Sequence, residues 1–120
     1  MKRLQQLLAD NKDIRSITDG LQEGLQEQLL AGLSGSSRSL YMAALYEQTS
    51  RPLLIVVPNL LHAQKVYEDL TSILDKKDVY LFPANELIAA ELSIASPELR
   101  TQRIETLNYL AHEGGRGIII

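Results

Sequence analysis

The sequence lacks cysteine, and this absence excludes disulfide bonds and thiolate metal ligands. No apolar run approaches the roughly 18 residues of a membrane-spanning helix, and the first residues lack the apolar core of a secretion signal. An excess of basic charge is also missing, because the net charge is −3. The sequence therefore predicts no general affinity for nucleic acid, and we expect a protein of the cytoplasm with no membrane partner.

The residues that are present have an ordinary globular composition, with 45% hydrophobic and 22% charged residues among 120. A chain of this length predicts one small domain or part of a larger one. Its last residues, Gly117-Ile118-Ile119-Ile120, are typical of a buried strand that is beginning. Because domains seldom stop inside a core element, we expect the chain to be part of a longer polypeptide.

Helical periodicity runs through residues 1–25, where leucine and isoleucine recur at spacings of three and four. Asn11 and the pair Asp19-Gly20 act as break signals within this pattern. We predict an N-terminal helical segment at 1–25, made of short helices that cover a sheet. Residues 26–120 are predicted to form part of an α/β domain.

Apolar runs alternate with amphipathic stretches through residues 26–120. Parallel strands need crossover helices of this kind, so the predicted class is α/β with a mostly parallel sheet flanked by helices. The uninterrupted apolar run at 53–57 is typical of an interior strand. The predicted strands are at 28–31, 53–57, 79–82 and from 117 onward, and the predicted helices are at 39–47, 60–74 and 96–112.

The last predicted helix has a clear start, with Ser96 as the N-cap and Pro97 in the first position. Gly114 is placed to end it. Residues 85–95, which precede it, fit either a helix or an ordered loop. We predict that four apolar residues of this helix face the core, namely Ile104, Leu107, Leu110 and Ala111.

The segment Gly32–Ser39 follows the first predicted strand and opens the next predicted helix. That is the place of a nucleotide phosphate loop, whose pattern is G-x-x-x-x-G-K-[ST]. Gly32 and Ser39 occupy the first and last positions of this pattern. Ser37 replaces its second glycine, and Arg38 replaces its lysine. The segment therefore has the frame of a phosphate loop without two of its functional residues.

These replacements bear directly on the chemistry of the loop. Gly32 and Gly35 keep some of the flexibility that lets N–H groups surround phosphates, and Ser39 keeps the hydroxyl that binds Mg²⁺. Arg38 keeps the positive charge, but its planar fork does not reproduce the compact ammonium of lysine. The sequence also has no Asp-Glu pair after an apolar strand to hold Mg²⁺.

Three interpretations of the loop stay open. It is a degenerate, non-hydrolysing relic of a nucleotide loop, a weak anion site, or a loop with no nucleotide ancestry. We favour the first, because the positions that carry the chemistry are the ones replaced. We accordingly predict no catalytic residue, no metal site and no cofactor for this chain.

Two arginines of the last predicted helix, Arg100 and Arg103, could meet phosphates or an acidic partner. The alternative is a solvated helix face on which they pair with Glu98 and Glu105, which lie close enough along the helix.

Several separate motifs carry a resemblance to a known family. The sequence resembles the N-terminal region of the bacterial transcription-repair coupling factors, the Mfd family, and the likeness covers about residues 1–120. In that family this region is a module similar to the excinuclease protein UvrB, the damage-verifying, helicase-like protein of nucleotide excision repair. The motifs that carry the resemblance lie at 31–40, 51–57, 82–87 and 96–105.

The resemblance implies a fold and a function. It implies a RecA-like half-domain of the P-loop NTPase type, truncated here, that has lost ATPase activity. In full-length family members ATP and Mg²⁺ serve distant motor domains that translocate on DNA, and other domains contact RNA polymerase and DNA. The module recruits the excinuclease protein UvrA through a small inserted domain, expected soon after Ile120. The chain is thus expected to be a non-catalytic scaffold in transcription-coupled repair.

Two alternatives belong to other functional classes. One is an ATP-binding segment of a DNA helicase or translocase that uses the Gly32–Ser39 loop. The other is a DNA-binding module of the UvrB type. The acidic net charge and the lack of aromatic residues at 84–95 count against the second. We also expect truncation to expose sheet edge and apolar surface through which two copies could form a dimer.

Overall fold

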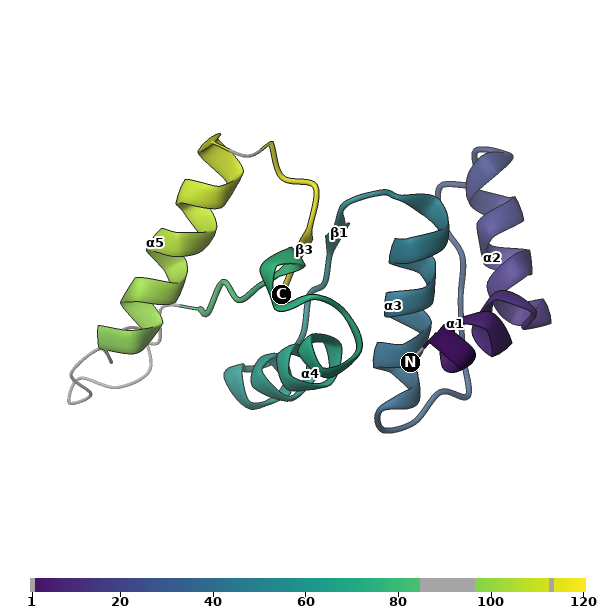
Figure 1. The fold of residues 1–120 in the computed structure, drawn as a ribbon, viewed down its shortest axis with the longest axis horizontal. Coiled ribbons are helices and arrows are strands. Elements are labelled where there is room, and N and C mark those ends of the chain that lie inside the picture. The colour runs from purple at the N-terminus through teal and green to yellow at the C-terminus, as the bar shows by residue number, and fades with distance from the viewer. Residues whose placement is uncertain (1, 85–96, 113) are drawn as a thin grey trace. The chain divides into compact units, whose positions relative to one another are not determined.

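A computed structural model describes residues 2–84, 97–112 and 114–120 of the chain (Figure 1). The chain divides into two compact units, Met1–Arg51 and Pro52–Ile120, and each is described by itself. None of the described helices has both the length and the hydropathy that crossing a membrane requires. In chain order the elements are α1 (Lys2–Ala9), α2 (Lys12–Gln22), α3 (Ser37–Thr49), β1 (Leu53–Leu54), α4 (Leu60–Ile73), the 3-10 helix η1 (Lys76–Asp78), β2 (Val79–Tyr80), α5 (Pro97–His112) and β3 (Ile118–Ile119).

The first unit is a small helical cluster in which α1 and α2 both pack against α3. Its buried side chains include Ile14 of α2 and Ala43 and Ala44 of α3. The prediction of short helices in residues 1–25 is confirmed. The break predicted at Asn11 is confirmed as well, because the Asn11 side chain caps α2 and accepts the Asp13 N–H at 2.8 Å.

The break predicted at Asp19-Gly20 is wrong, because α2 continues through both residues to Gln22. Gly20 is buried, and the side chain of Gln28 lies against it. A Cβ atom on Gly20 would come within 2.6 Å of Gln28 Oε1, while Gln28 Nε2 donates to the Ile17 carbonyl at 3.1 Å. This glycine makes room for a neighbouring side chain instead of ending the helix.

The strand predicted at 28–31 is also wrong, because these residues form no strand and Leu29 is 92% exposed. A strand needs a partner for its backbone groups, and none of the three described strands pairs with this segment. The helix predicted from residue 39 begins earlier, at Ser37. Three positions of the predicted phosphate loop, Ser37, Arg38 and Ser39, therefore lie in the first turn of α3.

The second unit contains a three-stranded parallel sheet in the order β1-β3-β2. Ile118 pairs with Leu53 on one side and with Val79 on the other. Hydrogen bonds extend the pairing beyond the strand ends, from Ile55 N to the Ile119 carbonyl at 2.8 Å, for example. The predicted α/β class and parallel sheet are confirmed, but the run at 53–57 lies at an edge of the described sheet, and β3 is interior.

The helices α4 and α5 cover opposite faces of this sheet. The crossover through α4 runs from β1 past β3 to β2, and the crossover through α5 returns from β2 to β3. Two right-handed crossovers that run in opposite directions place their helices on opposite faces, and Figure 1 shows the two helices on different sides of the strands. The helix predicted at 60–74 is confirmed as α4, which Asn59 caps by accepting the His62 N–H at 3.0 Å.

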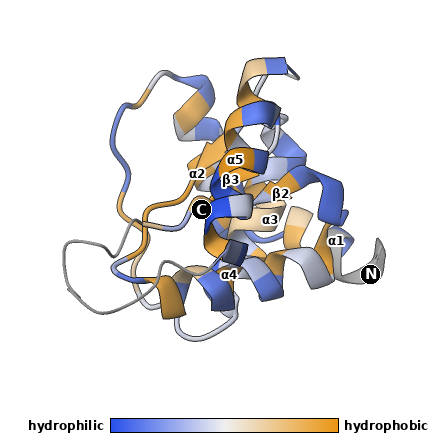
Figure 2. Cartoon of the chain, turned by 90° about the vertical axis from the view of Figure 1, so that its left-hand side faces the viewer, coloured by the Kyte–Doolittle hydropathy of each residue, from blue (hydrophilic) through white to orange (hydrophobic). Residues whose placement is uncertain are grey.

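The core of the second unit lies on the α4 face of the sheet. Ile118 is fully buried there, as is Leu70 of α4, and Val79 and Ile120 are nearly so. Figure 2 shows hydrophobic residues, in orange, along the strands and also on α5. Alternate strand residues point to the other face, where Ile119 is only half-buried.

The prediction for the inward face of α5 is wrong. Ile104, Leu107 and Leu110 are 56%, 52% and 42% exposed, and Ala111 is exposed too. Thr106 and Tyr109 face the sheet instead. The Thr106 hydroxyl donates to the Leu81 carbonyl at 2.8 Å, and the Tyr109 ring stacks on Tyr80 with centroids 4.0 Å apart. The prediction for residues 85–95 and the predicted N-cap Ser96 lie outside the described residues.

Gly117, just before β3, should not tolerate a side chain. A Cβ atom there would lie 2.5 Å from the Asp78 carbonyl oxygen and 3.0 Å from the Tyr109 hydroxyl. We expect Gly117→Ala to lower the free energy of unfolding of the second unit by about 2 kcal/mol, because backbone would have to move. Hydrogen exchange in peptides that contain β3 measures this change.

Gly20→Ala is the matched control, because neither glycine has a positive φ and the atoms crowding Gly20 belong to the flexible Gln28 side chain. Alanine also favours the helix by about 1 kcal/mol. In Gly20→Ala, the hydrogen-exchange protection of α2 should stay unchanged or rise. Equal losses of protection in both variants would show that contact with the Asp78 carbonyl is not the reason why position 117 excludes a side chain.

Candidate functional site

The predicted phosphate loop, Gly32–Ser39, lies in the first unit, between the coil after α2 and the start of α3. Gly32 and Gly35 have φ angles of +83° and +55°. Such left-handed conformations favour glycine, and here they turn the chain sharply into α3. No strand precedes the loop, so the strand–loop–helix arrangement of a nucleotide site is not present in the described residues.

The polar groups of this loop bond to one another. The Ser37 hydroxyl donates to the Ser34 carbonyl and accepts the Ser34 N–H at 3.0 Å. The Arg38 guanidinium donates through Nε to the Leu33 carbonyl at 3.2 Å. A working loop turns its N–H groups and its cation toward phosphate, whereas these side chains fasten the loop to the first turn of α3.

Ser39 occupies the position of the Mg²⁺-binding hydroxyl, yet its side chain is buried at 2% exposure. A metal ligand in a nucleotide site must reach the phosphates and the water around the ion. In this structure Ser39 is buried within the helical unit, where it already has an interaction partner. Among the described residues no cluster of histidine, aspartate or glutamate could hold a metal ion.

Arg100 and Arg103 have different environments on α5. Arg100 is exposed, and Arg103 is half-buried. The Arg103 guanidinium donates from Nη1 to the Pro83 carbonyl at 2.6 Å and lies 4.4 Å from the centre of the Phe82 ring. Arg103 thus ties α5 to the segment after β2, and Arg100 is the freer of the two to meet an external phosphate or acidic group.

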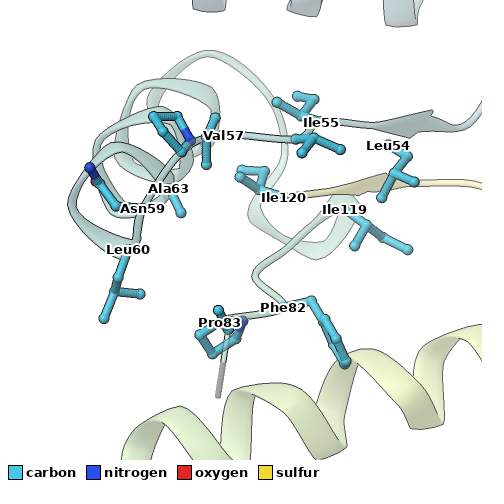
Figure 3. A pocket seen from close by; sticks show the side chains of 13 residues that line it. Leu54, Ile55, Val57, Asn59, Leu60, Ala63, Phe82, Pro83, Ile119 and Ile120 are labelled. Atoms are coloured by element: carbon cyan, nitrogen blue, oxygen red, sulfur yellow. The ribbon is translucent and has the colours of Figure 1, made fainter. Parts of the chain in front are cut away.

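The carboxyl ends of the strands surround a pocket of about 250 Å³ that sequence reasoning missed (Figure 3). Val57, Leu60 and Ala63 line it from the β1–α4 connection, and Phe82 and Ile120 line it from the ends of the other strands. Open α/β sheets bind ligands at this edge. The sequence did contain a signal for this pocket, because the ends of the predicted parallel strands must meet at one edge of a sheet.

The chemistry of this pocket is nevertheless limited. Its lining is almost entirely aliphatic or aromatic, and the one polar side chain among its described residues belongs to Asn59. The side-chain carbonyl oxygen of Asn59 is already engaged by the N–H of His62 and lies 2.8 Å from the His62 ring nitrogen Nδ1. None of the described lining residues is an acid, a base or a nucleophile, so these residues support the packing of apolar groups.

Comparison with known proteins identifies relatives of the chain in sequence. The transcription-repair-coupling factor of Bacillus subtilis (strain 168) is 49% identical over 112 residues, which are 93% of this chain and 10% of that protein. The chain is a homologue of one segment of the transcription-repair-coupling factors. The protein of the same name from Staphylococcus aureus (strain USA300) is 35% identical over 97 residues, or 81% of this chain and 8% of that protein.

The resemblance inferred from sequence motifs is therefore confirmed at the level of the coupling-factor family. The chain spans about a tenth of the length of the curated relatives that it matches. No protein-family profile matches it. No solved structure matches it either, so the RecA-like assignment stays a prediction.

The different environments of the two arginines in this coupling-factor homologue predict different effects of substitution. Arg103→Ala should lower the free energy of unfolding of the second unit by about 2 kcal/mol, because it removes a charge-assisted hydrogen bond and a cation–π contact. Arg100→Ala, on the same helix, should change it by less than about 0.5 kcal/mol. Urea unfolding with hydrogen exchange of α5 peptides as the readout distinguishes them. Equal effects would contradict a structural role specific to Arg103.

Proposed function

We propose that this chain is a non-catalytic scaffold module of a transcription-repair coupling factor. In this role it supports recruitment of the nucleotide excision repair machinery, through the excinuclease protein UvrA, to stalled RNA polymerase in the cytoplasm. The observation that carries the proposal is the 49% identity to the Bacillus subtilis coupling factor over 93% of the chain. Identity at that level across almost every element favours a shared role for the segment.

The internal contacts of the Gly32–Ser39 loop support the non-catalytic part of this proposal. Ser37 and Arg38 bond to the Ser34 and Leu33 backbone, and Ser39 is buried. Phosphate binding would require these contacts to break before new ones form. ATP and Mg²⁺ then serve motor domains elsewhere in the full-length protein, and other domains contact RNA polymerase and DNA.

The sheet of the second unit holds Ile120 through backbone hydrogen bonds. Ile120 N donates to the Tyr80 carbonyl at 3.0 Å, and Phe82 N donates to the Ile120 carbonyl at 2.7 Å. A following adaptor domain that binds UvrA would therefore start next to a residue whose N–H and carbonyl are both bonded to the β2 side of the sheet. The stretch at 84–95, in which a DNA-gripping hairpin would need aromatic residues, lies almost wholly outside the described residues.

Titration with Mg-ATP tests the non-catalytic role. Calorimetry on the chain should detect no binding up to millimolar Mg-ATP, because the loop groups are engaged with one another. The control is the variant Ser37→Gly/Arg38→Lys, which restores the consensus residues. It reports whether these two residues alone are enough for Mg-ATP binding. Micromolar binding by the unaltered chain that Arg38→Ala abolishes would instead identify an ATP-binding segment.

A chimera tests the scaffold role itself. When this chain replaces the matching segment of the Bacillus subtilis coupling factor, cells should keep faster repair of ultraviolet damage in transcribed strands than in non-transcribed strands. Arg38→Ala in the chimera should preserve the difference, whereas Ile118→Asp, at a fully buried position, should remove it by disrupting the sheet. Loss of strand preference in the unaltered chimera, at normal protein level and with normal ATP hydrolysis, would contradict the proposal.

A further inference from the structure

A second cavity of the second unit, separate from the pocket at the strand ends, lies beside β2. It has a volume of about 210 Å³ and lies between α4, η1, β2 and α5. Its lining includes Tyr67 of α4, Lys76 of η1, and Gln102 and Glu105 of α5. The apolar pocket at the strand ends offers almost no polar side chains, whereas this cavity presents several, so it is suited to a polar ligand.

The side-chain carbonyl oxygen of Gln102 is the unusual group in this cavity. It is buried, and it has no hydrogen-bond partner among the described residues. A buried acceptor without a partner raises the free energy of the folded state, and native structures contain few such groups. This atom therefore calls for a hydrogen-bond donor that the described residues do not supply.

Glu105 gives the cavity a second acceptor. It follows Gln102 by three residues on α5, and residues with this spacing are neighbours on a helix, with Cβ atoms about 5 to 6 Å apart. Glu105 is exposed, and its carboxylate forms no ion pair with a described residue. The α5 wall of the cavity thus carries a neutral acceptor and a negatively charged acceptor next to each other.

We propose that this cavity binds a guanidinium group, carried by an arginine side chain from outside these 120 residues. A guanidinium is planar and presents its N–H donors in a fixed fork, so it donates to two neighbouring acceptors at once. Its positive charge strengthens the hydrogen bond to a carboxylate such as that of Glu105. Tyr67 adds an aromatic ring to the lining, and guanidinium groups are attracted to the faces of such rings.

Lys76 is the one lining residue whose charge favours an anion instead. An anionic ligand, however, would meet the Glu105 carboxylate and would leave the Gln102 oxygen without a donor. Lys76 is exposed, and its long stem lets the ammonium extend into water when a cation enters. The buried acceptor therefore decides between the two kinds of ligand. This inference is independent of the proposed scaffold function.

A titration followed by NMR tests the site, with N-acetyl-L-arginine amide as the probe and N-acetyl-L-lysine amide as the control at equal ionic strength. The arginine probe should bind the chain with a dissociation constant on the order of 1 mM, as expected for so small a ligand. Its binding should shift the amide signals of Gln102 and Glu105. The lysine probe should bind more weakly, because its ammonium lacks the planar fork. Absence of saturable shifts, or equal binding of the two probes, would overturn the proposal.

Substitutions at position 102 identify the group that the probe contacts. Gln102→Leu should weaken binding about tenfold, because a hydrogen bond to a charged group is lost. Its midpoint of urea unfolding should stay unchanged or rise, since the substitution removes a buried acceptor that has no partner. Gln102→Glu keeps an acceptor and should retain binding. Full binding by Gln102→Leu, or loss of binding in Gln102→Glu, would contradict the role of the Gln102 oxygen.

The charged residues of the cavity give a second check. Glu105→Gln should weaken binding of the arginine probe, whereas Glu98→Gln, at an exposed position of the same helix, should leave it unchanged. Lys76→Gln should strengthen binding about twofold, because it removes a screened repulsion. Weaker binding in Lys76→Gln would show that the site prefers an anion.

The same two probes distinguish the sources of the arginine. Saturation-transfer NMR, which observes the probe, is applied to the isolated chain and to the Bacillus subtilis coupling factor chimera. Binding to both proteins would assign the arginine to a separate partner protein. Binding to the isolated chain alone would assign it to another region of the coupling factor, which then already occupies the cavity.

Discussion

The second unit depends on the insertion of β3 between β1 and β2. Those two strands do not pair with each other, and each joins the described sheet only through its pairing with β3. Ile118 lies at the centre of this arrangement, fully buried and paired on both sides. The close approach of Gly117 to Asp78 and Tyr109 follows from the same requirement, because β3 must fit into a gap one strand wide.

The helices were largely predictable from sequence, because their signals are local. The Asn11 and Asn59 caps and the apolar stripe of α4 depend on residues within a few positions of one another. The inward face of α5 was not predictable in this way. Thr106 is buried with its hydroxyl donating to the Leu81 carbonyl, twenty-five positions away in sequence. Hydropathy alone predicts instead that Leu107 is the buried residue. Strand order and the pocket at the strand ends likewise depend on partners distant in sequence.

The segment at 28–31 illustrates a further limit. A short apolar run has the composition of a strand, but it becomes one only where another strand offers hydrogen-bonding groups. The predicted phosphate loop depended on that strand, and the Ser37 and Arg38 side chains bond to the backbone of the loop instead. The replacements at Ser37 and Arg38 were visible in the sequence, whereas the burial of Ser39 and the contact of Arg38 with the Leu33 carbonyl required the structure.

The position of β3 has a consequence for biosynthesis. On the ribosome the helices of the first unit emerge early, and their contacts can form as soon as α3 is outside the exit tunnel. The second unit has to wait, because β1 and β2 have no strand partner among the described residues until 118–119 emerge. During that interval the apolar edge at 53–57 is accessible to nascent chains on neighbouring ribosomes, and exposed edges of this kind are where chaperones and misassembly compete.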